Sequence, residues 1–164
     1  MTEKKSISGI GKILSGIAGV HYVVSELSLR GLIALPTVRN TAGFDIVVTS
    51  PDGSWHANLQ VKSSKDKVYF WNVGKNYRKL RGNNKFFVFV RYLKKDSRFE
   101  AFLEKADQVA DDVEADVKER ESRGSHPRGS WHLPKTKEGK ERVHRQWLEF
   151  PKIMLETRQD SSQP

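Results

Sequence analysis

The nine residues Lys85–Leu93, KFFVFVRYL, constrain the fold more than any other stretch of the sequence, because they are almost entirely apolar and aromatic. A strand that buries only one face alternates apolar and polar residues, whereas a strand that is apolar at successive positions needs cover on both faces. The run therefore predicts the central strand of a sheet with other elements packed on each side. Such layering is typical of an α/β domain.

Helical and extended patterns alternate along the rest of the chain. Apolar residues recur with helical spacing from about Ile10 to Arg30, and Gly31 stands where helices commonly end. Glycines in the first half of this segment favour a helix start near residue 15. Further strands are expected at residues 32–35, 43–50, 54–63, 68–73 and 99–103, and further helices at residues 104–121 and 141–149.

The chain is long enough for one domain with a real core. We expect a flexible N-terminus at residues 1–9, a single α/β domain with a mixed sheet over residues 10–152, and a flexible tail at residues 153–164. Residues 122–140 are rich in Gly, Pro, Ser and Lys and predict a long basic loop. The apolar residues of the last helix that are expected to dock on the core are Val143, Trp147 and Leu148.

The net charge of +9 and the pI near 9.8 predict a polyanionic partner, with nucleic acid as the first candidate. The excess is uneven. Residues 61–100 carry 12 Lys and Arg against 3 Asp and Glu, residues 101–122 carry 3 against 8, and residues 123–152 carry 8 against 3. Most charge runs are simply solvated faces, but the bias of residues 61–100 favours a surface that faces phosphates.

Several chemistries and locations are disfavoured. The chain has no cysteine, so disulfides and thiolate metal sites are excluded, and its five histidines lack zinc-ligand spacing. The apolar stretch 10–24 is interrupted by Lys12 and His21 and is too short to span a bilayer. We therefore expect neither a secretory signal nor a membrane segment, and the composition fits the reducing cytoplasm.

The stretch GFDIVVTSPDGSWHANLQVKSS at residues 43–64 predicts a β-hairpin with one polar face. An Asp-Gly pair at residues 52–53, between two strand-like runs, is a strong signal for a tight turn. A two-residue turn there sets Asp45 directly across from Gln60, with Lys62 two residues further along the same face. Because opposed side chains lie roughly 5 Å apart, Asp45, Gln60 and Lys62 are expected to form one patch. The opposite, apolar face is expected to hold Trp55, Ala57, Leu59 and Val61.

Such a patch supports metal-assisted hydrolysis of phosphodiesters. The carboxylate of Asp45 and the amide oxygen of Gln60 are hard ligands suited to Mg²⁺ or Mn²⁺. An ion held there would activate a water, and Lys62 would orient that water or stabilise charge on the phosphate. Two protein oxygens are few for such an ion, so a further ligand is expected from elsewhere in the chain.

At these residues the sequence resembles the PD-(D/E)xK nuclease superfamily, in which an aspartate on one strand is followed, after a hairpin, by an acid or glutamine, any residue, and lysine. The resemblance covers about residues 20–64. It implies a restriction endonuclease-like fold, a mixed β-sheet flanked by helices, and a DNA endonuclease that depends on Mg²⁺ or Mn²⁺. The Holliday-junction resolvase-like and Mrr-like branches place a metal-binding glutamate on the preceding helix, which implies that role for Glu26.

Two positions depart from the usual pattern of the superfamily. Gln60 stands where most members have an acid, although the Mrr-like branch is similar in using glutamine there. The change removes one negative charge, which is expected to weaken metal binding. Phe44 stands where a proline often precedes the aspartate, a proline that members of the superfamily can lack.

Basic residues after the hairpin predict the surface that grips nucleic acid, and double-stranded DNA is the expected partner. The expected phosphate contacts are Lys65, Lys67, Lys75, Arg78, Lys79 and Arg81. Aromatic residues, Phe70 among them, interleave with these cations in a pattern that suits base stacking. The alternative is that the aromatic residues belong to the core while the cations keep the surface soluble. A homodimer is compatible with this interpretation, because one site cuts one strand at a time.

Two other functions stay open. The first is a catalytically silent nucleic-acid-binding subunit with the same fold, which Gln60 favours. The second is a protein-interaction role in which the acidic helix at residues 104–121 docks on a basic partner.

Overall fold

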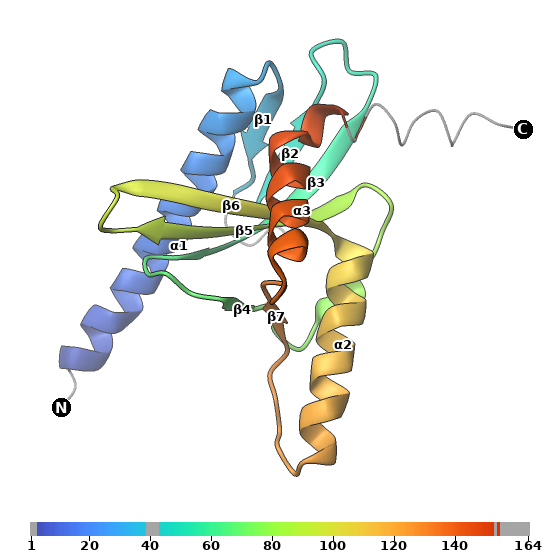
Figure 1. The fold of residues 1–164 in the computed structure, drawn as a ribbon. Coiled ribbons are helices and arrows are strands. Elements are labelled where there is room, and N and C mark those ends of the chain that lie inside the picture. The colour runs from blue at the N-terminus through green and yellow to red at the C-terminus, as the bar shows by residue number, and fades with distance from the viewer. Residues whose placement is uncertain (1–2, 39–42, 153, 155–164) are drawn as a thin grey trace, which may run out of the picture.

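A five-stranded mixed sheet with helices on both faces forms the body of the computed structural model, which describes residues 3–38, 43–152 and 154 (Figure 1). The strand order is β1-β2-β3-β5-β6, and only β3 and β5 run parallel. The strands are β1 (Ile33–Pro36), β2 (Ile46–Thr49), β3 (His56–Ser64), β5 (Lys85–Leu93) and β6 (Arg98–Lys105). The predicted mixed α/β architecture is confirmed. The expected C-terminal tail, apart from residue 154, lies outside the described residues.

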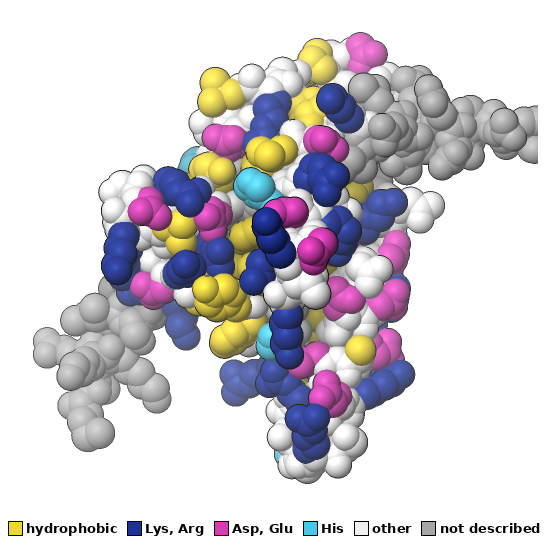
Figure 2. Space-filling view, viewed as in Figure 1, with side chains coloured by type: hydrophobic (Ala, Val, Ile, Leu, Met, Phe, Trp, Pro, Cys, Tyr) yellow, Lys and Arg dark blue, Asp and Glu magenta, His cyan; other side chains and the backbone are white. Residues whose placement is uncertain are grey.

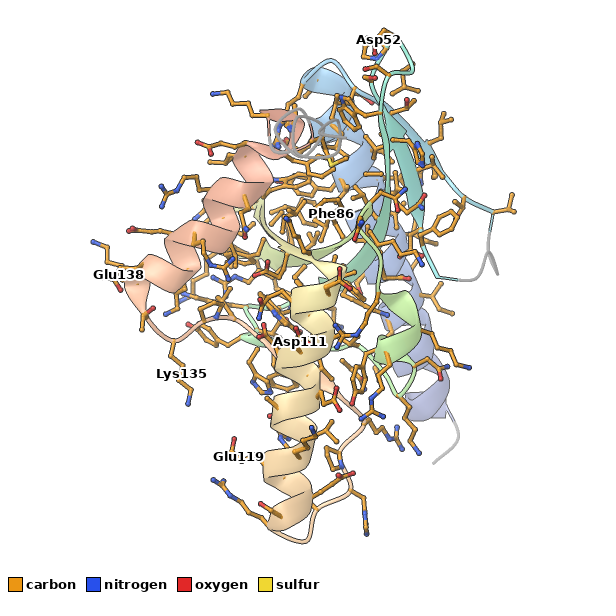
Figure 3. The ribbon with its side chains drawn as sticks, turned by 90° about the vertical axis from the view of Figure 1, so that its right-hand side faces the viewer. Asp52, Phe86, Asp111, Glu119, Lys135 and Glu138 are labelled. Atoms are coloured by element: carbon orange, nitrogen blue, oxygen red, sulfur yellow. The ribbon has the colours of Figure 1, made fainter. Side chains whose placement is uncertain are left out.

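Strand β5 is the buried centre of the sheet, as its composition predicts. It lies between β3 and β6, and its side chains enter two separate hydrophobic clusters on the two faces of the sheet. Phe86 points to one face, where Figure 3 shows it in the interior, and Phe89 points to the other. There Phe89 stacks on Trp131 with ring centroids 4.0 Å apart. Apolar residues at successive positions therefore fill two cores.

One face of the sheet is covered by helix α1 (Glu3–Leu29) and by the C-terminal end of helix α3 (Lys137–Leu148). Helix α1 begins at Glu3, earlier than the sequence predicted, although glycine weakens its first half. The packing explains this, because Gly19 is the point of close approach to β3. A Cβ added at Gly19 would lie 2.5 Å from the Cβ of Ser63. Tertiary contact thus offsets the poor helix propensity of glycine.

The other face is covered by helix α2 (Ala106–Ser122), by a 3₁₀ turn η1 (Tyr77–Leu80) and by a small sheet of β4 (Phe70–Asn72) and β7 (Ser130–His132). Strand β7 lies in the segment that was expected to be loop. Trp131 on β7 is almost fully buried, and so is Trp147 on α3. Leu148 was expected to dock on the core, but it is exposed because it follows Trp147 around the helix.

The hairpin of β2 and β3 has the register that the sequence predicts. Ile46 pairs with Leu59 and Thr49 with His56, which continues to Asp45 opposite Gln60. The strands are shorter than expected, because the connection extends around Asp52 at the tip of the hairpin (Figure 3). The apolar face, Trp55, Ala57, Leu59 and Val61, is buried as predicted.

The described helices include none that is both long enough and apolar enough to cross a membrane.

Candidate functional site

Asp45 lies just before β2, at the point where β3 loses its neighbouring strand. Its backbone N–H donates to the carbonyl of Leu59 at 2.8 Å, and its own carbonyl accepts from the N–H of Thr37 at 2.8 Å. The side chain then turns to the open edge of β3, where Oδ2 accepts the backbone N–H of Val61 at 2.8 Å. The carboxylate thus occupies the hydrogen-bonding position that the next residue pair of the ladder would have filled.

Gln60 and Lys62 are brought to this carboxylate, as the register predicts. The amide Nε2 of Gln60 donates to Asp45 Oδ2, the same oxygen that accepts the N–H of Val61. Lys62 is near enough to Asp45 for each side chain to influence the pKa of the other. The acid, the amide and the ammonium are therefore neighbours, and their catalytic and metal-binding roles stay predictions.

Burial governs the electrostatics of the pair. It raises the pKa of Asp45 above its ordinary value of 3.8, against the opposing effects of the Val61 N–H and the charge of Lys62. Burial also lowers the pKa of Lys62 below 10.5, against the charge of Asp45. Both groups are pushed toward their neutral forms, because desolvation disfavours either charge. Such opposed perturbations in adjacent groups are common at functional sites.

A pocket opens between Asp45 and α1, and it contains residues that the sequence did not single out for the site. The residues of α1 that line it are Lys12, Ile13, Gly16, Ile17, Val20 and His21. These positions lie on one face of a helix, so helical periodicity was the signal that would have found Lys12 and His21. The part of α1 that faces Asp45 thus carries a lysine and a histidine, and no carboxylate.

Glu26, the expected helix ligand, lies elsewhere. It lies beyond His21, the last residue of α1 that lines the pocket. It forms an ion pair with Arg30 at 2.8 Å. Arg30 in turn donates to the carbonyl of Trp147 at 2.6 Å and lies 4.5 Å above its ring. These contacts bring Glu26 to the C-terminal end of α3 and away from the pocket beside Asp45.

The oxygen ligands beside the hairpin are therefore few. Among the residues that the structure describes, no group of three or more Asp, Glu, His or Cys side chains is placed to hold a metal ion. Asp45 and Gln60 offer one carboxylate and one amide. These are hard donors of the type that Mg²⁺ and Mn²⁺ accept, but the set carries only one negative charge.

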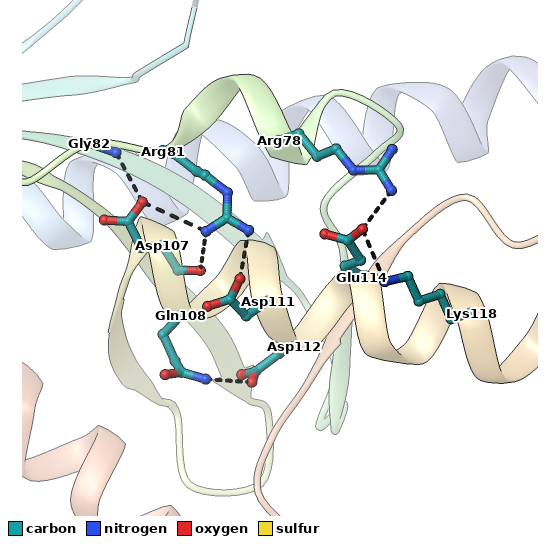
Figure 4. A network of polar contacts seen from close by, with 9 residues as sticks. All are labelled: Arg78, Arg81, Gly82, Asp107, Gln108, Asp111, Asp112, Glu114 and Lys118. Carbon is teal, nitrogen blue, oxygen red and sulfur yellow. Dashed lines mark hydrogen bonds and ion pairs between the residues drawn. The ribbon is translucent and has the colours of Figure 1, made fainter.

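Two of the expected phosphate contacts are engaged within the protein. Arg78 pairs with Glu114 at 3.0 Å, and Arg81 pairs with Asp111 at 2.6 Å (Figure 4). Arg81 also donates to the backbone carbonyl of Asp107 at 3.3 Å. Arg78 of η1 and Arg81, the residue that follows η1, thus dock on the acidic residues of α2. Figure 2 shows the same interleaving of acidic and basic side chains over the face that carries α2 and α3.

The lysines of the basic segment are distributed differently. Lys65 lies close to α1, because a Cβ added at Gly11 would be 3.6 Å from its Nζ. Lys67 and Lys79 are exposed. Lys75 lines a second pocket, between η1 and the chain after α2. The predicted surface is therefore split, and Lys65 is the member that lines a cavity together with Lys62.

The aromatic residues of the basic segment fall into two groups, one buried in the core and one exposed at the surface. Trp71 is buried and donates from its indole to the carbonyl of Val90 at 3.1 Å, so it belongs to the core. Phe70, on the other side of β4, has 56% of its surface exposed. The sequence left core and stacking roles open for this segment, and the alternation of β4 assigns one side to each environment.

No protein-family model matches the chain, and no curated protein matches it significantly in sequence. Among solved structures, the fold is similar to that of a bacterial homing endonuclease, I-Ssp6803I, with a TM-score of 0.53 and 17% sequence identity. The match covers 91% of this chain and 98% of that chain. At this identity the likeness shows the fold alone, which is a mixed α/β arrangement.

Proposed function

We propose that the protein is a metal-dependent DNA endonuclease of the PD-(D/E)xK type, with its site at Asp45, Gln60 and Lys62. The observation that carries the proposal is the contact of the Gln60 amide with the Asp45 carboxylate, beside the half-buried Lys62. The superfamily resemblance in sequence rests on the same residues, and the likeness in fold to a homing endonuclease extends over 91% of the chain; both support nucleic acid as the substrate.

Each residue of the site would have its own role in phosphodiester hydrolysis. A bound Mg²⁺ or Mn²⁺ supplies the Lewis acid that activates a water and neutralises charge on the phosphate. Asp45 offers this ion its carboxylate, which the N–H of Val61 holds in place. Gln60 donates through Nε2 to Asp45 in this arrangement, and a rotation of its amide group would present the amide oxygen to the same ion. Lys62 orients the water, and its lowered pKa brings it nearer the range in which it exchanges a proton.

The test is plasmid cleavage in Mn²⁺ by Asp45→Asn and Lys62→Met, which keep the size of each side chain. We expect each variant to cut at least about a hundredfold more slowly than wild type, the usual loss when a charge that acts on the transition state is removed. Asp96→Asn and Lys105→Met are matched controls on the exposed surface, outside the pocket beside Asp45 and the expected phosphate contacts, and are expected to cut within about twofold of wild type. Full-rate cleavage by both site variants would show that the site is elsewhere.

A second function, a silent DNA-binding subunit, is favoured by the single carboxylate of the site. Calorimetric titration with Mn²⁺ separates the two functions. An endonuclease binds the ion, and Asp45→Asn abolishes the binding heat. A silent subunit shows no heat with Mn²⁺ while it still binds DNA with a steep dependence on salt.

We further infer that the substrate is double-stranded and that two copies of the chain act together on the two strands. Sedimentation analysis with and without duplex DNA tests the second point, because a protein that stays a monomer on its substrate contradicts it. The cysteine-free composition supports action in the reducing cytoplasm.

A further inference from the structure

A groove of about 670 Å³ runs between the N-terminal half of α1 and the end of β3, with β4 as its floor. It adjoins the pocket beside Asp45, since Lys12 lines both cavities. Asp45 lines the first cavity and Lys62 lines the second. The groove is thus the continuation of the proposed catalytic site along α1.

Three ammonium groups gather at this groove, those of Lys12, Lys62 and Lys65. The Nζ of Lys65 is turned toward α1 near Gly11. None of the three forms an ion pair within 4.0 Å with an acidic residue of the described chain. One carboxylate, that of Asp66, also lines the groove, and it pairs with Lys94 at 2.8 Å. The three lysines therefore outnumber the acidic groups of the groove, and an excess of cations around a concave surface creates a positive potential that attracts phosphate.

The floor of the groove is apolar. Val68, Phe70 and Trp71 line it, and Phe70 is the member that is mostly exposed. The ring of Phe70 packs on His132, with centroids 5.8 Å apart, which fixes its orientation. An exposed aromatic ring beside cations is the arrangement that single-stranded nucleic acid recognises, by stacking of a base and contact of its phosphate.

We propose that this groove receives an unpaired nucleotide of the substrate strand, with its phosphate against Lys12 and Lys65 and its base against Phe70. A base within a duplex is covered on both faces by its neighbours, so only a base that has left the stack is able to lie on Phe70. The proposal rests on the proposed function and specifies its substrate more closely. The substrate is duplex DNA with an unpaired segment beside the bond to be cut, such as an overhang, a flap, a junction or the locally unpaired DNA of a supercoiled plasmid.

The first test measures binding without cleavage, by fluorescence anisotropy in the absence of divalent metal. Two DNAs share one duplex sequence, and one of them carries a single-stranded overhang. Wild type is expected to bind the overhang DNA about tenfold more tightly than the blunt duplex, the gain of stacking one base. Phe70→Leu should lose that preference. Tyr69→Leu, a change at the neighbouring exposed ring that does not line the groove, should keep it.

The second test concerns the lysines. Lys12→Met and Lys65→Met are each expected to reduce by about one the slope of log affinity against log salt concentration. Lys105→Met, at an exposed lysine outside the groove, is expected to leave the slope unchanged. Circular dichroism melting of all the variants shows whether they fold alike.

The outcomes separate this inference from the proposed function. Equal affinity for the two DNAs, or a preference that survives Phe70→Leu, overturns the unpaired nucleotide. Plasmid cleavage that needs Asp45 would still stand in that case. Conversely, a preference for overhang DNA that depends on Phe70, without any cleavage, supports the groove and favours a silent binding subunit.

Discussion

Helices α1 and α2 are attached to the sheet in different ways. Helix α1 rests on β3 by close approach of backbones at Gly19. The lysines of the groove between α1 and β3, which are Lys12, Lys62 and Lys65, form no ion pair with a described acidic residue. Helix α2 is joined to η1 by ion pairs that engage Arg78 and Arg81. One attachment leaves cations available to a ligand and the other uses them within the fold. The basic excess of a segment therefore indicates a binding surface only where the fold leaves its charges unpaired.

The largest effect is expected from filling the contact of α1 with β3. Gly19→Ala places a Cβ 2.5 Å from the Cβ of Ser63, which is fixed to the backbone of β3. We expect a loss of about 1–3 kcal/mol in the free energy of unfolding, the usual cost of overpacking, measured by urea denaturation. Gly16→Ala is the matched control. No atom lies within 4 Å of its added Cβ, so the variant should gain up to about 1 kcal/mol in helix propensity.

A Gly19→Ala variant as stable as wild type would mean that α1 does not depend on this contact. The contrast drawn between the two helices would then be wrong for α1, because close packing at Gly19 would not be what attaches it to β3.

The next effect is on DNA affinity and compares the two sets of cations directly. The double variant Lys12→Met with Lys65→Met should bind DNA about tenfold more weakly at moderate salt, because two phosphate contacts are lost. Arg78→Met with Arg81→Met removes the same charge, but these guanidinium groups are held by α2 (Figure 4). That variant should bind within about twofold of wild type in the same titration. Equal losses in the two variants would remove the distinction between free and engaged cations.

This distinction also explains how far the sequence could be interpreted. The β2–β3 hairpin and its register were predictable, because the Asp-Gly turn and the alternation of apolar residues are local signals. The pairing of Arg81 with Asp111 was not, because it joins segments far apart in the chain. Glu26 was assigned by its position in a motif, whereas its rotation on α1 depends on which face of the helix packs on the sheet.

A smaller effect is expected on stability at the site itself. Burial raises the pKa of Asp45 in the folded state above 3.8, so ionisation of this carboxyl works against folding. Its contribution to stability is therefore complete below pH 3.8 and is lost as the pH rises through the folded pKa. Asparagine does not ionise, so Asp45→Asn does not lose this stability as the pH rises. Its melting temperature should exceed that of wild type at neutral pH, and the two melting temperatures should converge toward pH 3.8.

Mn²⁺ should reverse this order of melting temperatures, so that wild type melts above Asp45→Asn. An ion that binds only the folded protein raises the melting temperature of wild type, while Asp45→Asn should show no response to Mn²⁺. If Asp45→Asn is less stable than wild type at neutral pH without metal, the ionised carboxylate stabilises the metal-free fold. That result would contradict a carboxylate whose charge is compensated only when a cation binds.

The smallest effect is expected from Glu26→Gln. Its pair with Arg30 is partly exposed, with 35% of the glutamate side chain accessible, and such pairs contribute less than about 1 kcal/mol. Arg30 keeps its hydrogen bond to the Trp147 carbonyl and its contact with the Trp147 ring. Plasmid cleavage and the calorimetric heat of Mn²⁺ should therefore stay within about twofold of wild type. A Glu26→Gln variant that melts normally but neither binds Mn²⁺ nor cuts would mean that α1 turns to bring Glu26 to Asp45, and the attachment of α1 described here would not be the active one.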